Sequence, residues 1–209
     1  MMRLALPKGR NLKTARQAFE AAGWSLSSLD ADDRRLVVHQ PDLDLELMLL
    51  KDWDVPVYVE YGIADFGVVG SDVLEEVGGD VLVPARFTEG RSRMSLIGRS
   101  QAALPKAGEQ VRLASKFPVI ARAVVDQKPW SAEILKLWGS VELGPLLKLA
   151  EVALDIVQTG RTLQENDLVE LEVVRQIAPI LIVNRAAYQQ HRSALNGLFA
   201  SLEAAGVVE

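Results

Sequence analysis

Residues 155–163, with the sequence DIVQTGRTL, combine an acid, a glycine and two hydroxyl side chains at a spacing that suits a sugar phosphate. They lie between an apolar stretch typical of a strand and a helical pattern, where unpaired N–H groups and the helix dipole favour a dianion. Gly160 lets the backbone approach phosphate closely, Thr159 and Thr162 add donors, and Asp155 is placed to accept hydrogen bonds from sugar hydroxyls. The stretch predicts a ribose 5-phosphate site, although by itself it also fits the capped start of an ordinary helix.

Cationic residues follow several of the predicted strands. Lys8 and Arg10 follow the apolar residues 4–6 within a few positions, and Lys51 comes two residues after the stretch 45–49. In an open α/β sheet, ligands bind in the crevice beyond the carboxyl ends of the strands. Each of these residues, and Arg34 with its neighbour Arg35, also fits a solvated turn or a surface charge beside a strand.

Short apolar runs alternate with helical patterns along the whole chain, which predicts an α/β protein with mixed, mostly parallel sheets. Strands are expected at residues 4–6, 36–38, 45–49, 66–69, 81–84, 94–97, 111–114, 133–137, 154–157, 169–174 and 180–183. Helices are expected from a cap at Asn11 to Gly23, at 54–60, from 70–72 onward, at 118–127, at 141–149, and as one last helix with the apolar stripe Tyr188, Leu195, Leu198 and Leu202. A domain boundary is expected near residues 87–91.

Composition excludes several classes of protein. The net charge of -5 argues against a general nucleic-acid or anionic-membrane surface, because both need a basic face. The chain has no cysteine, so it has neither disulfides nor thiolate metal sites. The apolar start is too short for a signal peptide and the longest apolar run, residues 177–183, cannot span a bilayer. We therefore expect a cytoplasmic protein without a membrane role.

Five separated motifs resemble those of the ATP phosphoribosyltransferase family of histidine biosynthesis. They are residues 4–10 (LALPKGR), 54–60 (DVPVYVE), 62–70 (GIADFGVVG), 139–143 (GSVEL) and 155–163 (DIVQTGRTL). The resemblance runs collinearly from about Arg3 to about Tyr188. The chain is similar to the short form of the family, which lacks the C-terminal regulatory domain of the long form.

The resemblance implies a two-lobed fold of the periplasmic-binding-protein type (type II). Lobe I would comprise residues 1–88 and 178–209 and carry the cationic residues, and lobe II would comprise residues 89–177 and carry the loop for phosphoribosyl pyrophosphate. It also implies a regulatory subunit that resembles histidyl-tRNA synthetase, with the chain forming a homodimer within a hetero-octamer.

The implied reaction is attack by N1 of ATP on C1 of phosphoribosyl pyrophosphate, giving N1-(5-phosphoribosyl)-ATP and pyrophosphate. Adenine N1 has a free lone pair, so the barrier should fall by alignment of the reactants and neutralisation of the departing pyrophosphate. By position in the motifs, Lys8, Arg10, Arg34 and Lys51 would supply that charge together with Mg²⁺ carried by substrate phosphates. Lys51 stands where many members have arginine, whose bidentate fork an ammonium cannot copy.

The same resemblance gives the substrate-binding residues. Asp155 would hold the ribose diol, and Thr159, Gly160, Arg161 and Thr162 would hold the 5-phosphate, with Arg161 using either its side chain or only its N–H. Glu142 would bind a ribose hydroxyl or the adenine, and its alternative is a carboxylate that favours the start of a helix. After this motif the family usually continues APLTGLAD, whereas residues 144–151 read GPLLKLAE, so that Leu147-Lys148 replaces Thr-Gly. This departure bears on the nucleotide site.

Other functions are weighed against this one. Salvage phosphoribosyltransferases usually carry two adjacent acids in the phosphate loop, whereas Leu154 precedes Asp155 here. A two-lobed module that captures a small anion, or a non-catalytic subunit of the same fold, is the remaining alternative. His39 and His191 fall in no motif and are not expected to act in catalysis.

Overall fold

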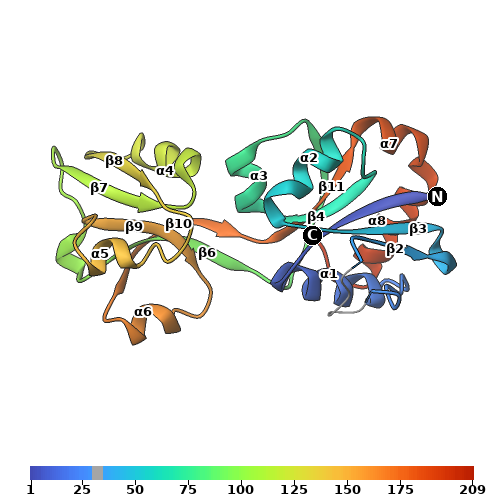
Figure 1. Ribbon diagram of the computed structural model, residues 1–209, viewed down its shortest axis with the longest axis horizontal. Helices are drawn as coiled ribbons and strands as arrows, with labels where there is room; N and C mark the ends of the chain where they lie inside the picture. The colour runs from blue at the N-terminus through green and yellow to red at the C-terminus, as the bar shows by residue number, and fades with distance from the viewer. Residues whose placement is uncertain (30–34) are drawn as a thin grey trace. The chain divides into compact units, whose positions relative to one another are not determined.

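The computed structural model describes residues 1–29 and 35–209 and divides into two compact units. Unit 1 is formed by Met1–Arg91 together with Ala178–Glu209, and unit 2 is formed by Ser92–Ile177 (Figure 1). Each unit contains its own β-sheet. Arg34, one of the four predicted catalytic cations, lies outside the described residues. Within the described part of the chain, no helix is both long and apolar enough to cross a membrane.

Unit 1 is built on a six-stranded sheet with the order β2-β3-β1-β4-β11-β5. The strands are β1 (Met2–Pro7), β2 (Val37–Gln40), β3 (Leu45–Leu50), β4 (Phe66–Gly70), β5 (Val81–Arg86) and β11 (Pro179–Asn184). The helices are α1 (Arg10–Ala21), α2 (Val55–Glu60), α3 (Ser71–Val77), α7 (Arg185–Gln190) and α8 (Arg192–Ala204), with short 3-10 turns η1 (Pro41–Leu43) and η2 (Asp52–Asp54). Strand β1 pairs in parallel with β3 and β4, and the other pairings are antiparallel.

The core of unit 1 lies on both faces of this sheet, because successive side chains of a strand point to opposite faces. Leu4 and Leu6 of β1 belong to one buried cluster with Phe19 of α1, whereas Ala5 between them belongs to a second cluster with Val55 of α2. A strand buried on both sides carries an unbroken apolar run, which explains why β1 could be recognised in the sequence.

Unit 2 is built on a five-stranded sheet with the order β10-β6-β9-β7-β8. The strands are β6 (Ser92–Gly98), β7 (Gln110–Ser115), β8 (Ser131–Lys136), β9 (Val152–Val157) and β10 (Val169–Ile177). The helices are α4 (Pro118–Val125), α5 (Leu143–Leu146) and α6 (Arg161–Glu165), with the 3-10 turn η3 (Gln101–Ala103). Strands β7, β8 and β9 are parallel, so their carboxyl ends lie at one edge of the sheet, whereas β6 and β10 pair antiparallel.

The expected α/β class with mixed sheets is confirmed. Parallel pairing is less general than expected, because it is confined to β1 with β3 and β4 and to β7 with β8 and β9. The remaining strand pairs run antiparallel.

Three local predictions were wrong. Helix α1 begins at Arg10 after Gly9, whose φ of 93° turns the chain straight out of β1, so Asn11 lies inside the helix rather than capping it. Helix α5 is one turn long, because the chain leaves it through Lys148 at a φ of 61°. The last helix is two helices, because His191 leaves the helical conformation with φ −113° and ψ 25° and begins α8.

Candidate active site

A pocket lies in unit 2 at the carboxyl end of β9, where the chain passes through residues 158–160 into α6. Its volume is about 180 Å³, and it is lined by Ile97, Glu142 and residues 156–163. Pockets for whole drug-sized ligands usually measure about 300–1,000 Å³. The pocket therefore suits one end of a larger ligand, of the size of a phosphate and part of a sugar.

The loop that forms this pocket presents backbone and hydroxyl groups. Gly160 has a φ of 77° and directly precedes α6. A Cβ there would meet no atom closer than 4.0 Å, so the glycine is needed for its conformation rather than for space. The hydroxyl oxygen of Thr159 accepts a hydrogen bond from the N–H of Arg161 at 3.4 Å, a long bond that a ligand oxygen could replace.

Asp155 lies on the same face of the sheet as this pocket. Ala153 and Val157 of β9 belong to the buried cluster that also holds Leu163 of α6, and Asp155, two residues from each of them, points to the same face of the sheet. Its Oδ1 accepts the N–H of Ile156 at 2.8 Å. Glu142, the residue before α5, lines the pocket from the other side of the loop. Glu142 thus lines the pocket itself, whereas Asp155 lies next to the lining residue Ile156 and is not among the lining residues.

In unit 1, cations gather at the edge where the parallel strands end. Pro7 of β1 is paired in register with Leu50 of β3, so Lys8 and Lys51 leave the sheet side by side. The N–H of Lys8 donates to the carbonyl of Leu50 at 2.8 Å, and both lysines are exposed. Two adjacent cations at a strand edge form a local positive field on a protein that is acidic as a whole.

A buried acid follows the neighbouring strand β4, at the start of α3. Asp72 in the first turn of α3 is 6% exposed, and its carboxylate lies against the backbone of Gly70. Burial raises the pKa of Asp72, the N–H groups of Asp72 and Val73 oppose that rise, and the charges of Asp52 and Arg10 act in opposite directions. The buried carboxylate is therefore electrostatically coupled to Arg10 at the start of α1.

A family model described as "HisG: ATP phosphoribosyltransferase" matches residues 51–204, which is most of the chain. The chain belongs to the ATP phosphoribosyltransferase family. It is 39% identical over 205 residues to an ATP phosphoribosyltransferase of Acidithiobacillus ferrooxidans, covering 96% of this chain and 95% of that protein. It is 36% identical over 202 residues to the ATP phosphoribosyltransferase of Syntrophotalea carbinolica, covering 95% and 92%.

Solved structures agree with this assignment. The ATP phosphoribosyl transferase (HisG:HisZ) complex from Thermotoga maritima contains a chain that superposes with a TM-score of 0.81 at 31% identity, with 98% of both chains covered. A substrate binding protein of an amino acid ABC transporter has a TM-score of 0.53 at 10% identity, covering 97% and 91%, which concerns the fold alone. The periplasmic-binding-protein-like class predicted from the sequence is confirmed.

Against the residues expected for an ATP phosphoribosyltransferase, the structure brings Glu142 into one pocket with Thr159, Gly160, Arg161 and Thr162. The side chain of Arg161 is 81% exposed and donates from Nε to Glu165 at 2.7 Å, so its N–H rather than its guanidinium is the group directed at the loop. In unit 1, Lys8 and Lys51 leave the sheet side by side, and Arg10 follows Lys8 as the first residue of α1.

Two charged groups of this family member were missed in the sequence. Asp72 was treated as part of a helix start, although an acid just after the apolar strand residues 66–70 is a signal that could have singled it out. Arg93 carries no local signal, because its partners Gln158 and Glu170 lie 65 and 77 residues away. Its contacts depend on the pairing of β6 with β9 and β10.

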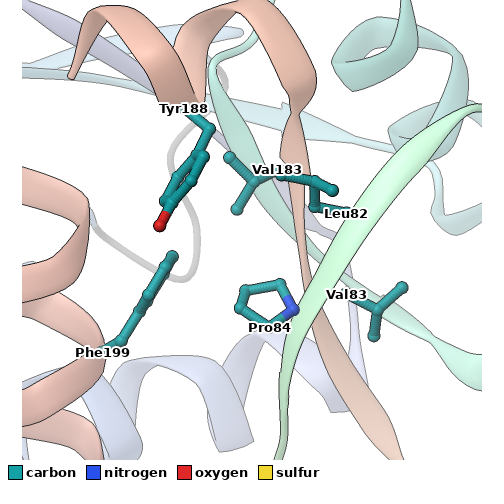
Figure 2. A pocket seen from close by; sticks show the side chains of 6 residues that line it. All are labelled: Leu82, Val83, Pro84, Val183, Tyr188 and Phe199. Carbon is teal, nitrogen blue, oxygen red and sulfur yellow. The ribbon is translucent and has the colours of Figure 1, made fainter. Parts of the chain in front are cut away.

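A second cavity of about 300 Å³ lies in unit 1 between β5, β11 and the last two helices (Figure 2). Figure 2 shows the rings of Tyr188 and Phe199 on one side and Pro84 opposite, with Leu82, Val83 and Val183 completing the wall. None of these lining residues is charged, so this cavity does not suit the phosphates of either substrate. Within residues 1–29 and 35–209, no three His, Cys, Asp or Glu side chains are grouped so as to hold a metal ion.

Proposed function

We propose that the chain is the catalytic subunit of ATP phosphoribosyltransferase. It would join N1 of ATP to C1 of phosphoribosyl pyrophosphate and release pyrophosphate, the first step of histidine biosynthesis, in the cytoplasm. The observation that carries the proposal is the pocket at the end of β9, in which a glycine loop faces Glu142 in a member of this family.

The pocket would hold the phosphoribosyl end of phosphoribosyl pyrophosphate. The N–H groups of residues 159–162 and the two threonine hydroxyls bind the 5-phosphate, because several weak donors around one dianion act together. Asp155 accepts hydrogen bonds from the ribose diol, and Glu142 binds a ribose hydroxyl or the adenine. The pocket volume of about 180 Å³ leaves the pyrophosphate at C1 outside it.

The chemical step then needs alignment and charge rather than a base. The lone pair of adenine N1 attacks C1 while the bond from C1 to the pyrophosphate oxygen breaks, and the electron pair leaves with pyrophosphate. Lys8, Arg10, Arg34 and Lys51 neutralise that developing charge. The charge of Arg10 favours the ionised form of the Asp72 carboxyl, so the two groups attract each other.

Mg²⁺ fits this arrangement as an ion carried by the substrate phosphates. The side chains at the strand edge of unit 1 are mainly cationic, and Asp72 is buried, so this edge suits a metal carried by phosphate better than one held in a protein cage. When bound, Mg²⁺ would neutralise part of the pyrophosphate charge.

The chain is proposed to work with a second subunit. The Thermotoga maritima protein that it resembles is a HisG:HisZ complex, and 98% of both chains is covered. We infer that this chain forms a homodimer within a hetero-octamer, together with a regulatory subunit that resembles histidyl-tRNA synthetase.

The test mixes the purified chain with ATP, Mg²⁺ and phosphoribosyl pyrophosphate, with and without the regulatory subunit, and follows adduct absorbance and pyrophosphate release. Asp155→Asn and Thr162→Ala should each raise KM for phosphoribosyl pyrophosphate about tenfold or more, because each removes a group in contact with the sugar phosphate. Asp126→Asn, at the exposed end of α4, is the matched control and should leave KM unchanged.

The replacement of Thr-Gly by Leu147-Lys148 favours one alternative, a non-catalytic or anion-binding subunit of the same fold. Binding of phosphoribosyl pyrophosphate without adduct under either condition would support that alternative. Lack of binding as well as of adduct would refute both functions.

A further inference from the structure

Arg93 of β6 links two strands of unit 2 to the phosphate loop. Its Nε and Nη2 donate to the two carboxylate oxygens of Glu170 at 2.5 and 2.7 Å, and its Nη1 donates to the carbonyl of Gln158 at 3.2 Å. The hydroxyl of Ser95 donates to the same carboxylate at 2.6 Å. One guanidinium therefore joins β6, β10 and the residue directly before Thr159.

The direction of the Gln158 carbonyl sets the direction of the next N–H group, that of Thr159, in the phosphate loop. Strand β9 ends at Val157, and the peptide between Gln158 and Thr159 is where the chain passes from the strand into the phosphate loop. That peptide is planar and trans, and its N–H points opposite to its carbonyl. Because the carbonyl faces Arg93, the N–H of Thr159 faces away from Arg93. Thr159 lines the phosphate pocket, and Arg93 is not among the residues that line it.

We propose that Arg93, held by Glu170, is a positioning residue that fixes the Gln158–Thr159 peptide with its N–H directed at the 5-phosphate of phosphoribosyl pyrophosphate. This inference rests on the proposed function. The charge of Arg93 is balanced by Glu170 at 2.5 Å, so its contribution is orientation of the loop rather than direct attraction of the phosphate.

The geometry needs a guanidinium with three directed donors. Two donors engage the carboxylate and the third reaches the carbonyl, a planar fork that an ammonium cannot reproduce. The hydrogen bond from Arg93 also lowers the pKa of Glu170, because the guanidinium stabilises the ionised carboxylate. Lysine at position 93 would keep the charge and lose the orientation.

A matched control exists within the same unit. Arg112 donates to Glu151 at 2.6 and 3.3 Å and to the carbonyl of Lys148 at 3.3 Å. Glu151 precedes β9, whereas Gln158 follows it, so this second fork lies at the opposite end of the strand from the phosphate loop. Arg112→Ala removes a similar set of contacts without touching the pocket.

The experiment compares Arg93→Ala, Arg93→Lys and Arg112→Ala in the full chain, with the regulatory subunit present for kinetics. Hydrogen exchange of a peptide covering residues 158–163 reports loop order, and calorimetry with phosphoribosyl pyrophosphate reports Kd. Both Arg93 variants should speed exchange of this peptide and raise Kd about tenfold, the equivalent of about 1.4 kcal/mol, while KM for ATP stays the same. Arg112→Ala should change neither measurement.

Wild-type Kd and exchange in Arg93→Ala would overturn the inference, as would rescue by Arg93→Lys. Faster exchange with unchanged Kd would also overturn it, because loop order would then not set affinity. If Arg112→Ala changed exchange and Kd as much as Arg93→Ala, general destabilisation of unit 2 would explain both results, and the inference would be overturned. Failure of the proposed function is distinguishable, because it shows as absent adduct formation in the wild type, whereas exchange of the substrate-free loop still reports on Arg93.

Discussion

Lys148 occupies a backbone position that favours glycine, and its replacement by glycine should stabilise unit 2. The N–H of Leu149 donates to the carbonyl of Gly144 at 2.9 Å and the N–H of Lys148 donates to that of Pro145 at 3.4 Å. This is the hydrogen-bond pattern of a Schellman motif, in which Lys148 is the residue with left-handed conformation, at a φ of 61°.

The size of the effect follows from two opposing terms. A non-glycine residue in the left-handed region costs about 1–2 kcal/mol, and glycine adds about 0.5–1 kcal/mol of unfolded-state entropy. Lys148→Gly should therefore stabilise by about 0.5–1 kcal/mol. For a chain of 209 residues this corresponds to a rise in Tm of about 1–4 °C.

Thermal unfolding followed by circular dichroism measures this change, with Lys148→Ala as control. The side chain of Lys148 is exposed, so its removal alone should matter little, and alanine keeps the left-handed strain. Lys148→Gly should therefore have a higher Tm than Lys148→Ala. An equal rise in both variants would show that the side chain rather than the backbone is responsible, and a lower Tm for Lys148→Gly would refute the strain argument.

Three further predictions concern charged residues. Lys51→Ala should lower kcat about tenfold or more, and Lys51→Arg should retain turnover, in a steady-state assay in which exposed Lys13→Ala is the control and should be unchanged. The pKa of Glu151 is lowered from 4.5 to about 2 by its hydrogen bonds with Arg112, so its contribution to stability is present above about pH 4.5 and lost as pH falls toward 2. The Glu151→Gln variant should therefore lose less stability than the wild type when the pH is lowered. Identical acid-unfolding curves for the two proteins would contradict the assignment. Burial raises the pKa of Asp72, so ionisation of this carboxyl opposes folding at neutral pH. Asp72→Asn should therefore raise the Tm at pH 7 and, through the loss of its charge near Arg10, lower kcat. An unchanged kcat would show that Asp72 does not act on Arg10.

The sequence by itself determined the strands, the order of the motifs and the family. Buried strands such as β1 and β4 carry uninterrupted apolar runs, and the glycine loop of residues 158–160 combines its chemistry within a few consecutive residues. Such signals are local, so they can be recognised without knowledge of what packs against them. For the same reason the type II α/β class could be predicted from the motifs.

The tertiary structure decided which distant residues meet. Strand register places Lys8 beside Lys51, and the pairing of β6 with β9 brings Arg93 to Gln158. These contacts depend on pairings between segments far apart in sequence, which leave no periodic pattern in either segment. The left-handed conformation of Lys148 at the end of α5 likewise appears only in the structure, because a lysine gives no local signal for it.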